Sequence, residues 1–108
     1  MKDINLSHMH EIQQELQEKY VEKWGGLSPE IAKEKLLWMM IEVGEAADII
    51  KKEGNAAIME RGEVRAHFIE ELCDVMMYLN DVMLCYSITP EEMATAYEEK
   101  HRRNMNRW

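Results

Sequence analysis

Two long stretches of the sequence combine an apolar helical seam with pairs of acidic residues, and this combination constrains the fold more than any other feature. The first stretch runs from Leu36 to Ile50 and the second from Phe68 to Met83. At about 100° per residue, the apolar side chains of each stretch fall on one continuous seam. The two seams consist of Leu36, Met40, Val43, Ala47 and Ile50 and of Phe68, Leu72, Val75, Leu79, Val82 and Tyr86. Because the first stretch is apolar almost all round, we expect its helix to be buried on several sides.

Each stretch carries two acids three residues apart, Glu42 with Glu45 and Glu71 with Asp74. This spacing places both carboxylates of a pair on one helix face, about one turn apart. Inside such apolar helices we expect the acids to point into the protein, where an isolated charge is costly unless it is paired or binds a metal. Neither stretch contains a Lys or Arg. If the helices pack antiparallel, the two pairs can face one another and bind Mg²⁺, which prefers oxygen ligands. The alternative is that some acids face solvent or pair with cations near the helix ends.

Four main helices are expected, at residues 7–24, 28–52, 63–86 and 90–103, with a connector between the second and the third. Ser7 and Ser28 are candidate N-caps, and Thr89 with Glu92 forms a capping box around Pro90. The first helix has an ordinary amphipathic pattern, with an apolar side made of Met9, Ile12, Leu16 and Tyr20. We therefore expect one all-α domain over residues 1–108, an antiparallel bundle of four main helices. A helix apolar on both sides argues against a monomer, so oligomerisation is expected to complete the bundle.

Charge and cysteine content narrow the class of protein. The chain has 13 basic and 21 acidic residues and a net charge of −8, which disfavours binding to nucleic acid polymers or anionic membranes. Cys73 and Cys85 lie on one expected helix, about 18 Å apart along its axis, so they cannot bridge each other. No signal peptide or membrane-spanning segment is evident, and we expect a cytoplasmic protein. A zinc site is not expected, since no CxxC or paired Cys/His spacing occurs.

The motif Glu42-Val43-Gly44-Glu45, followed after 25 residues by Glu71-Leu72-Cys73-Asp74-Val75, resembles the ExxE…ExxD signature of MazG-like nucleotide pyrophosphohydrolases. The likeness covers most of the chain from about Trp24 onward, and its further matches are Tyr78, Lys100, Asn104, Arg107 and Trp108. It implies an all-α homodimer or homotetramer in which the four acids bind Mg²⁺, or Mn²⁺. The implied reaction is hydrolysis of a nucleoside triphosphate, often a deoxynucleotide, to the monophosphate and pyrophosphate. Ile41 stands where many members have an additional Glu, so the number of metal ions stays open.

The resemblance also implies roles for individual side chains. Glu45 or Glu71 is expected to orient the attacking water. Lys100 and Arg107 are expected to contact phosphates, and Asn104 the sugar or a phosphate. Favourable placement of positive charge at a helix C-terminus explains some of the basic tail equally well. Removal of non-standard nucleotides and control of a nucleotide pool are both compatible with such an activity.

Three aromatic residues, Trp24, Trp38 and Tyr78, are candidates to stack on or enclose the base, although large aromatics at helical spacing are more often core residues. Two other classes of protein remain open. A di-iron carboxylate protein needs Glu-x-x-His pairs on two helices, and the chain offers one candidate, Glu98 with His101. A non-catalytic helical module that dimerises through its Met-rich faces is the other.

Overall fold

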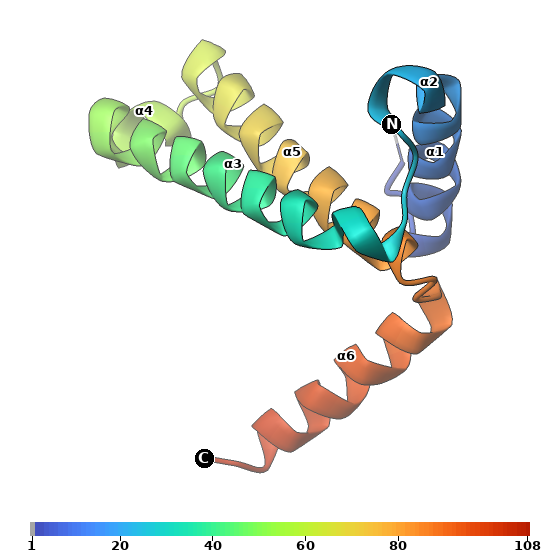
Figure 1. The fold of residues 1–108 in the computed structure, drawn as a ribbon. Helices are drawn as coiled ribbons and strands as arrows, with labels where there is room; N and C mark the ends of the chain where they lie inside the picture. Colours follow the sequence, from blue (N-terminus) through green and yellow to red (C-terminus); the bar gives the residue numbers. More distant parts are fainter. Residues whose placement is uncertain (1) are drawn as a thin grey trace.

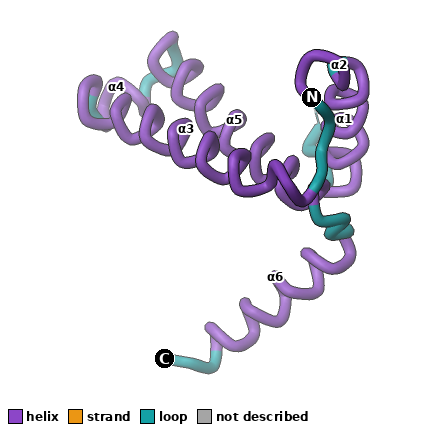
Figure 2. Tube along the Cα trace, viewed as in Figure 1, coloured by secondary structure: helices purple, strands orange, loops and turns teal. Residues whose placement is uncertain are grey.

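The computed structural model describes residues 2–108, which form six α-helices, one short 3₁₀ helix and no β-strand (Figures 1 and 2). The elements are α1 (Leu6–Lys19), α2 (Val21–Trp24), η1 (Pro29–Ile31), α3 (Ala32–Glu53), α4 (Asn55–Met59), α5 (Glu63–Cys85) and α6 (Pro90–Met105). Within these residues, no helix has both the length and the apolar character needed to cross a membrane. The all-α prediction is therefore confirmed.

The helix ends follow local side-chain chemistry. Asn5, and not the expected Ser7, caps α1, because its side chain accepts a hydrogen bond from the backbone N–H of His8 at 2.8 Å. The capping box of α6 is present as expected. The backbone N–H of Glu92 donates to Thr89 Oγ1 at 3.1 Å, and the backbone N–H of Thr89 donates to Glu92 Oε1 at 3.0 Å.

Two helices expected to be continuous are divided by short breaks. The first breaks at Tyr20, after which α2 adds a single turn that ends at Gly25, whose φ of 84° is the left-handed conformation favoured by glycine. The second begins with one 3₁₀ turn at Pro29, and the side chain of Ser28 makes no capping hydrogen bond to the helix. Ser28 was therefore wrong as a side-chain cap, although Pro does occupy the first helical position.

The centre of the fold is an antiparallel hairpin of α3 and α5, joined through α4 (Figure 1). Helix α1 packs on α5, near the end of the hairpin where α5 finishes and α3 begins. Helix α6 leads away from the hairpin and, among the described elements, contacts α1 only. One chain by itself therefore does not close a four-helix bundle.

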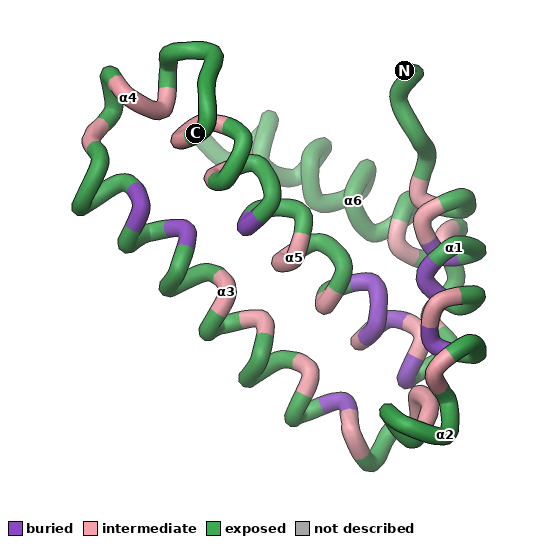
Figure 3. The backbone as a smooth tube through the Cα atoms, turned by 90° about the horizontal axis from the view of Figure 1, so that it is seen from above, coloured by how far each residue is buried: buried purple, intermediate pink, exposed green. Residues whose placement is uncertain are grey.

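The hairpin helices face each other through their acid-bearing sides. The side of α3 packed on α5 includes the half-buried Glu42, whereas Met40 on the apolar seam is 65% exposed. On α5, Glu71 and Asp81 are buried, whereas the seam residue Leu72 is exposed. Figure 3 shows that most of the α3 trace is exposed, whereas exposed positions alternate with intermediate and buried ones along α5. The expectation that α3 is buried on several sides is therefore wrong for a single chain, because only one side of it has a neighbour.

Helix α1 packs through a face that is more polar than expected. Three residues of its expected apolar side are partly buried, Met9, Leu16 and Tyr20, whereas Ile12 is exposed. The most buried positions of the helix are polar, namely His10, Gln13 and Gln17. The two glutamine amides take the buried positions because each finds a hydrogen-bond partner on α5.

The resulting shape is open for a chain of this size. The accessible surface is 8622 Å², against about 6,300 Å² for a compact monomer of the same 12.8 kDa mass. The radius of gyration is 16.2 Å, against about 13 Å for a compact domain of this length. The additional surface includes both apolar seams of the hairpin, many of whose members are more than a third exposed.

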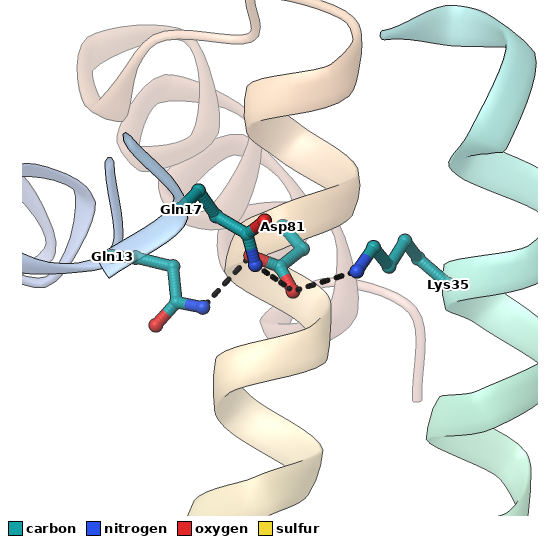
Figure 4. A network of polar contacts seen from close by, with 4 residues as sticks. All are labelled: Gln13, Gln17, Lys35 and Asp81. Atoms are coloured by element: carbon teal, nitrogen blue, oxygen red, sulfur yellow. Dashed lines mark hydrogen bonds and ion pairs between the residues drawn. The ribbon is translucent and has the colours of Figure 1, made fainter. Parts of the chain in front are cut away.

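A buried polar network connects three helices around Asp81, which is only 2% exposed (Figure 4). Gln13 Nε2 donates to Asp81 Oδ1 at 2.8 Å, and Gln17 Nε2 lies 3.3 and 3.4 Å from the two carboxylate oxygens. Lys35 Nζ from α3 lies 3.9 Å from Asp81 Oδ2. Burial raises the pKa of Asp81, and the hydrogen bond from Gln13, the charge of Lys35 and the hydrogen bond from Gln17 oppose that rise. The network fixes α1 against the end of the hairpin.

Replacing Asp81 by Asn is expected to lower the free energy of unfolding by about 2 kcal/mol, the scale of hydrogen bonds to a charged acceptor. The Asn amide provides one acceptor oxygen in place of two and turns a competing donor toward the glutamines. Chemical denaturation followed by circular dichroism measures the change. Asp48→Asn is the matched control, because Asp48 forms an exposed ion pair with Lys52 at 2.9 Å, and its loss should cost less than about 0.5 kcal/mol. Equal effects of the two substitutions would contradict a structural role for the network.

Candidate active site

Three glutamates meet between the hairpin helices. Glu42 and Glu45 project from α3 and Glu71 projects from α5, and one carboxylate oxygen of each lies within 4.8 Å of the others. Asp74, one turn beyond Glu71, does not belong to this tight group, although its charge contributes to the raised pKa of Glu42. The i, i+3 spacing and the antiparallel packing together bring the two motif pairs face to face. We refer to Glu42, Glu45, Glu71 and Asp74 as the acidic cluster.

The acidic cluster holds more negative charge than its surroundings compensate. The pKa of Glu42 is raised to about 7 by several causes together, of which interaction with Glu71 is the largest, followed by partial burial and the charges of Glu45, Asp74 and Glu71. Burial and the charges of Glu71 and Glu70 also raise the pKa of Asp74.

The acidic cluster has few partners that could neutralise its charge. In residues 2–108, neither Lys nor Arg forms an ion pair with any of its four acids. Glu71 is only 9% exposed. Its Oε1 atom lies 3.2 Å from His67 Nε2, and the Oε2 atom of Glu71 is buried without a hydrogen-bond partner. A buried, unpaired carboxylate oxygen among further carboxylates is the donor set that suits a hard divalent cation. The residues present therefore fit Mg²⁺.

The raised pKa of Glu42 makes the stability of the metal-free protein depend on pH. Its folded-state pKa of about 7 lies above its ordinary value of 4.5, so the contribution to stability is complete below pH 4.5 and is lost as pH rises through 7. We expect the metal-free protein to melt at a lower temperature at pH 8 than at pH 5.5, and Mg²⁺ to stabilise it more at pH 8. Thermal unfolding across this range tests both expectations.

The comparison with Glu42→Gln isolates the contribution of Glu42 from that of the other titratable groups in the chain. The variant should lose the part of the pH dependence that Glu42 contributes and most of the stabilisation by Mg²⁺. A variant with the same pH profile as the wild type would show that Glu42 is not the titrating group.

A cavity of about 520 Å³ lies beside the acidic cluster, and Asp74 lines it. It brings together Trp24 from α2, Trp38 from α3 and Tyr78 from α5. Burial is the first of several causes that raise the pKa of Tyr78, and Lys35 Nζ lies 5.9 Å from the centre of its ring. The three aromatic candidates therefore share one cavity, which opens next to the motif acids.

The cavity also contains residues that sequence reasoning missed. These are Gln13, Gln17, Lys35 and Asp81. The sequence did contain a signal for Asp81: it is an acidic residue within the apolar α5 stretch, as is Asp74, which lies two turns before it. The glutamines gave no such signal, since polar residues on a short amphipathic helix ordinarily face solvent.

The basic tail is not brought to the acidic cluster within one chain. Lys100, Asn104 and Arg107 gather with neighbouring arginines around an exposed groove of about 520 Å³ on α6. In the described part of the chain α6 contacts α1, and not α3 or α5. The turn before α6, which includes Ser87 with a φ of 54°, directs the helix away from the hairpin. The expectation that these residues share a ligand with the acids is therefore not met by a single chain.

Comparison with known proteins found no family model, no curated protein and no solved structure that matches this chain. The likeness to MazG-like enzymes consequently stands on the motif residues and their spacing. What the structure itself establishes is an all-helical chain with three clustered glutamates and an aromatic cavity that Asp74 lines.

Proposed function

We propose that the protein is a Mg²⁺-dependent nucleoside triphosphate pyrophosphohydrolase, which converts a triphosphate and water to the monophosphate and pyrophosphate. One observation carries the proposal. Glutamates from two facing helices converge without a Lys or Arg partner, one of them with a buried unpaired oxygen, and Asp74 next to them lines an aromatic cavity. Such an arrangement can hold a cation with the phosphates and a planar base next to each other.

The four acids would share the cation, and Glu45 would have a second task. Glu42, Glu45, Glu71 and Asp74 would hold Mg²⁺ or Mn²⁺, and the bound cation supplies positive charge that neutralises the triphosphate. Glu71 is oriented by His67, whereas Glu45 is exposed and makes no hydrogen bond or ion pair with other described residues. Glu45 is thus free to accept a proton from water that attacks the α-phosphorus, with pyrophosphate as the leaving group.

The decisive experiment is a panel of ribo- and deoxynucleoside triphosphates, assayed for pyrophosphate release with and without Mg²⁺. We expect release of pyrophosphate and a monophosphate in equal amounts, with at least one triphosphate, and only when the cation is present. Release of inorganic phosphate and a diphosphate would place the attack on a different phosphorus. No hydrolysis of any triphosphate would refute the proposal.

The basic tail fits this function only if a second copy of the chain supplies it. The acidic cluster has no Lys or Arg ion-pair partner among residues 2–108, and Lys100, Asn104 and Arg107 belong to a basic surface at the α6 end of the chain, which leads away from its own hairpin. We propose that in a homodimer or homotetramer the tail of one subunit faces the acids of another, where it would contact the triphosphate. Charge complementarity between the two surfaces supports this arrangement.

Mixing two inactive variants tests the arrangement. Glu71→Gln and Lys100→Ala are each expected to be inactive alone, because one lacks a ligand and the other a phosphate contact. If the site is shared, denaturing and refolding them together should restore about a quarter of wild-type activity, since half of randomly paired dimers carry one intact site. A tail that acts within its own chain would give no recovery.

The exposed apolar seams favour a second candidate function, a non-catalytic module that assembles through α3 and α5. In that case Mg²⁺ with a nucleotide would not raise the melting temperature, whereas an enzyme should be stabilised by both. The structure offers no comparable support for a di-iron protein, because Glu98 and His101 are exposed on α6, away from the acidic cluster.

A further inference from the structure

The acidic cluster has a hydrogen-bond partner outside itself, the side chain of His67. This residue lies on α5 one turn before Glu71, so both project from the same helix face, and its Nε2 atom is 3.2 Å from Glu71 Oε1. Among residues 2–108, no other side chain from outside the cluster makes a hydrogen bond or an ion pair with its four acids. His67 is therefore the neighbour that can orient a carboxylate of the cluster.

The hydrogen bond restrains a carboxylate that would otherwise rotate. The terminal torsion of a Glu side chain has broad minima, so a carboxylate without partners samples many orientations. Oε2 of Glu71 has no hydrogen-bond partner in the described structure, which leaves the bond between Oε1 and His67 as the restraint. A carboxylate that binds a cation is ionised and only accepts hydrogen bonds, so Nε2 carries the hydrogen and donates it.

His67 itself lies outside the group of side chains that could share one ion. Glu42, Glu45 and Glu71 each offer an oxygen within 4.8 Å of the others, and the imidazole of His67 does not belong to this set. Its side chain is 60% exposed and borders a hollow of about 420 Å³ on the hairpin. An exposed side chain of this kind contributes little to packing, so its substitution can alter the cluster without unfolding the helices.

We infer that His67 is a positioning residue for the cation, because its Nε2–H group holds the carboxylate of Glu71 in the orientation that the cation requires. Loss of a hydrogen-bond partner of a metal ligand typically costs about 10–100-fold in metal affinity or activity. The inference rests on the proposed function for the presence of the cation. It concerns the affinity for the cation, and not the base or the attacking water.

Two substitutions of similar length separate the hydrogen bond from the bulk of the side chain. His67→Gln keeps an N–H donor close to the position of Nε2, whereas His67→Met has none, and both new residues are good helix formers. Titration with Mn²⁺ alone, followed by the electron paramagnetic resonance signal of the free ion, measures affinity without nucleotide or turnover. We expect His67→Met to weaken Mn²⁺ binding by about tenfold or more, and His67→Gln to restore most of the wild-type affinity.

His8→Met is the matched control, because His8 is an exposed histidine on α1 that pairs with Glu11 at 3.7 Å. It should leave Mn²⁺ affinity unchanged. In EDTA, His67→Met should melt within about 3 °C of the wild type, since an exposed side chain adds little stability. Wild-type Mn²⁺ affinity in His67→Met, or equal weakening in the Met and Gln variants, would overturn the inference. A much lower melting temperature in EDTA would assign His67 to the fold and overturn it as well.

The nucleotide assay keeps this inference apart from the proposed function. If triphosphates are hydrolysed, His67→Met should need about tenfold more Mg²⁺ for half-maximal pyrophosphate release and should recover most of the wild-type kcat at saturating Mg²⁺. An unchanged Mg²⁺ requirement in an active variant would overturn the inference and leave the proposed function intact. If no triphosphate is hydrolysed, the proposed function fails and the Mn²⁺ titration decides: weaker binding by His67→Met supports the inference, and absence of binding to the wild type overturns it.

Discussion

Glu71→Gln is expected to lower Mg²⁺-dependent pyrophosphate release by more than about a hundredfold. Mutating even a residue that only hydrogen-bonds to a metal ligand typically lowers metal affinity or activity by about 10–100-fold, and Glu71 is proposed to be a ligand itself. Glu71 is the most buried member of the acidic cluster, and its Oε2 has no partner in the described structure. The amide keeps the size of the side chain, but it removes the charge and places a donor where an acceptor is needed. Steady-state assays and far-ultraviolet circular dichroism separate loss of activity from loss of helix.

The control for this substitution is Glu70→Gln. Glu70 precedes Glu71 on α5, is exposed and lies outside the acidic cluster. Its substitution removes the same charge from the same helix, so activity should stay within about twofold of the wild type, as expected for a surface change away from a site. Full activity in Glu71→Gln would refute the site, and an equal loss in both variants would point to a general electrostatic effect.

The wild-type chain is expected to have a solution mass at least twice its 12.8 kDa. Its surface exceeds that of a compact monomer by about 2,300 Å², an area typical of obligate interfaces. Covering the apolar seams of α3 and α5 with a second copy accounts for this excess, and the melting temperature should then rise with protein concentration. Light scattering after size exclusion and unfolding at several concentrations measure the two effects.

Met40→Glu is expected to shift the protein toward the monomer and to lower its melting temperature. Met40 lies in the middle of the exposed α3 seam, where a charge would be buried without a partner in the assembly. Lys33→Glu also adds negative charge to α3 at an exposed position, but outside the seam, so it should keep the wild-type mass. A monomeric wild type at micromolar concentration would contradict the assembly and the shared site together.

Much of the local structure could be read from the chain alone. The all-α class, the capping box at Thr89, and the i, i+3 acid pairs depend on residues only a few positions apart. Hydrogen bonds of a helix and its caps form within one or two turns, so neighbouring residues specify them. The two motif pairs also predicted the acidic cluster, given that the short connector makes α3 and α5 run antiparallel.

Only the tertiary structure decided which helix faces meet. Both the seam that includes Met40 and the motif acids of α3 were expected to point inward, but only the side that carries Glu42 packs on α5, and Met40 and Glu45 are exposed. The Asp81 network joins residues 64 and 68 positions apart, and the distance between the tail and its own acids depends on the direction of a single turn. Periodicity shows which side chains share a face, but burial of that face depends on the summed free energy of all contacts made by distant elements. Those contacts are set by packing in three dimensions, which no local pattern of residues encodes.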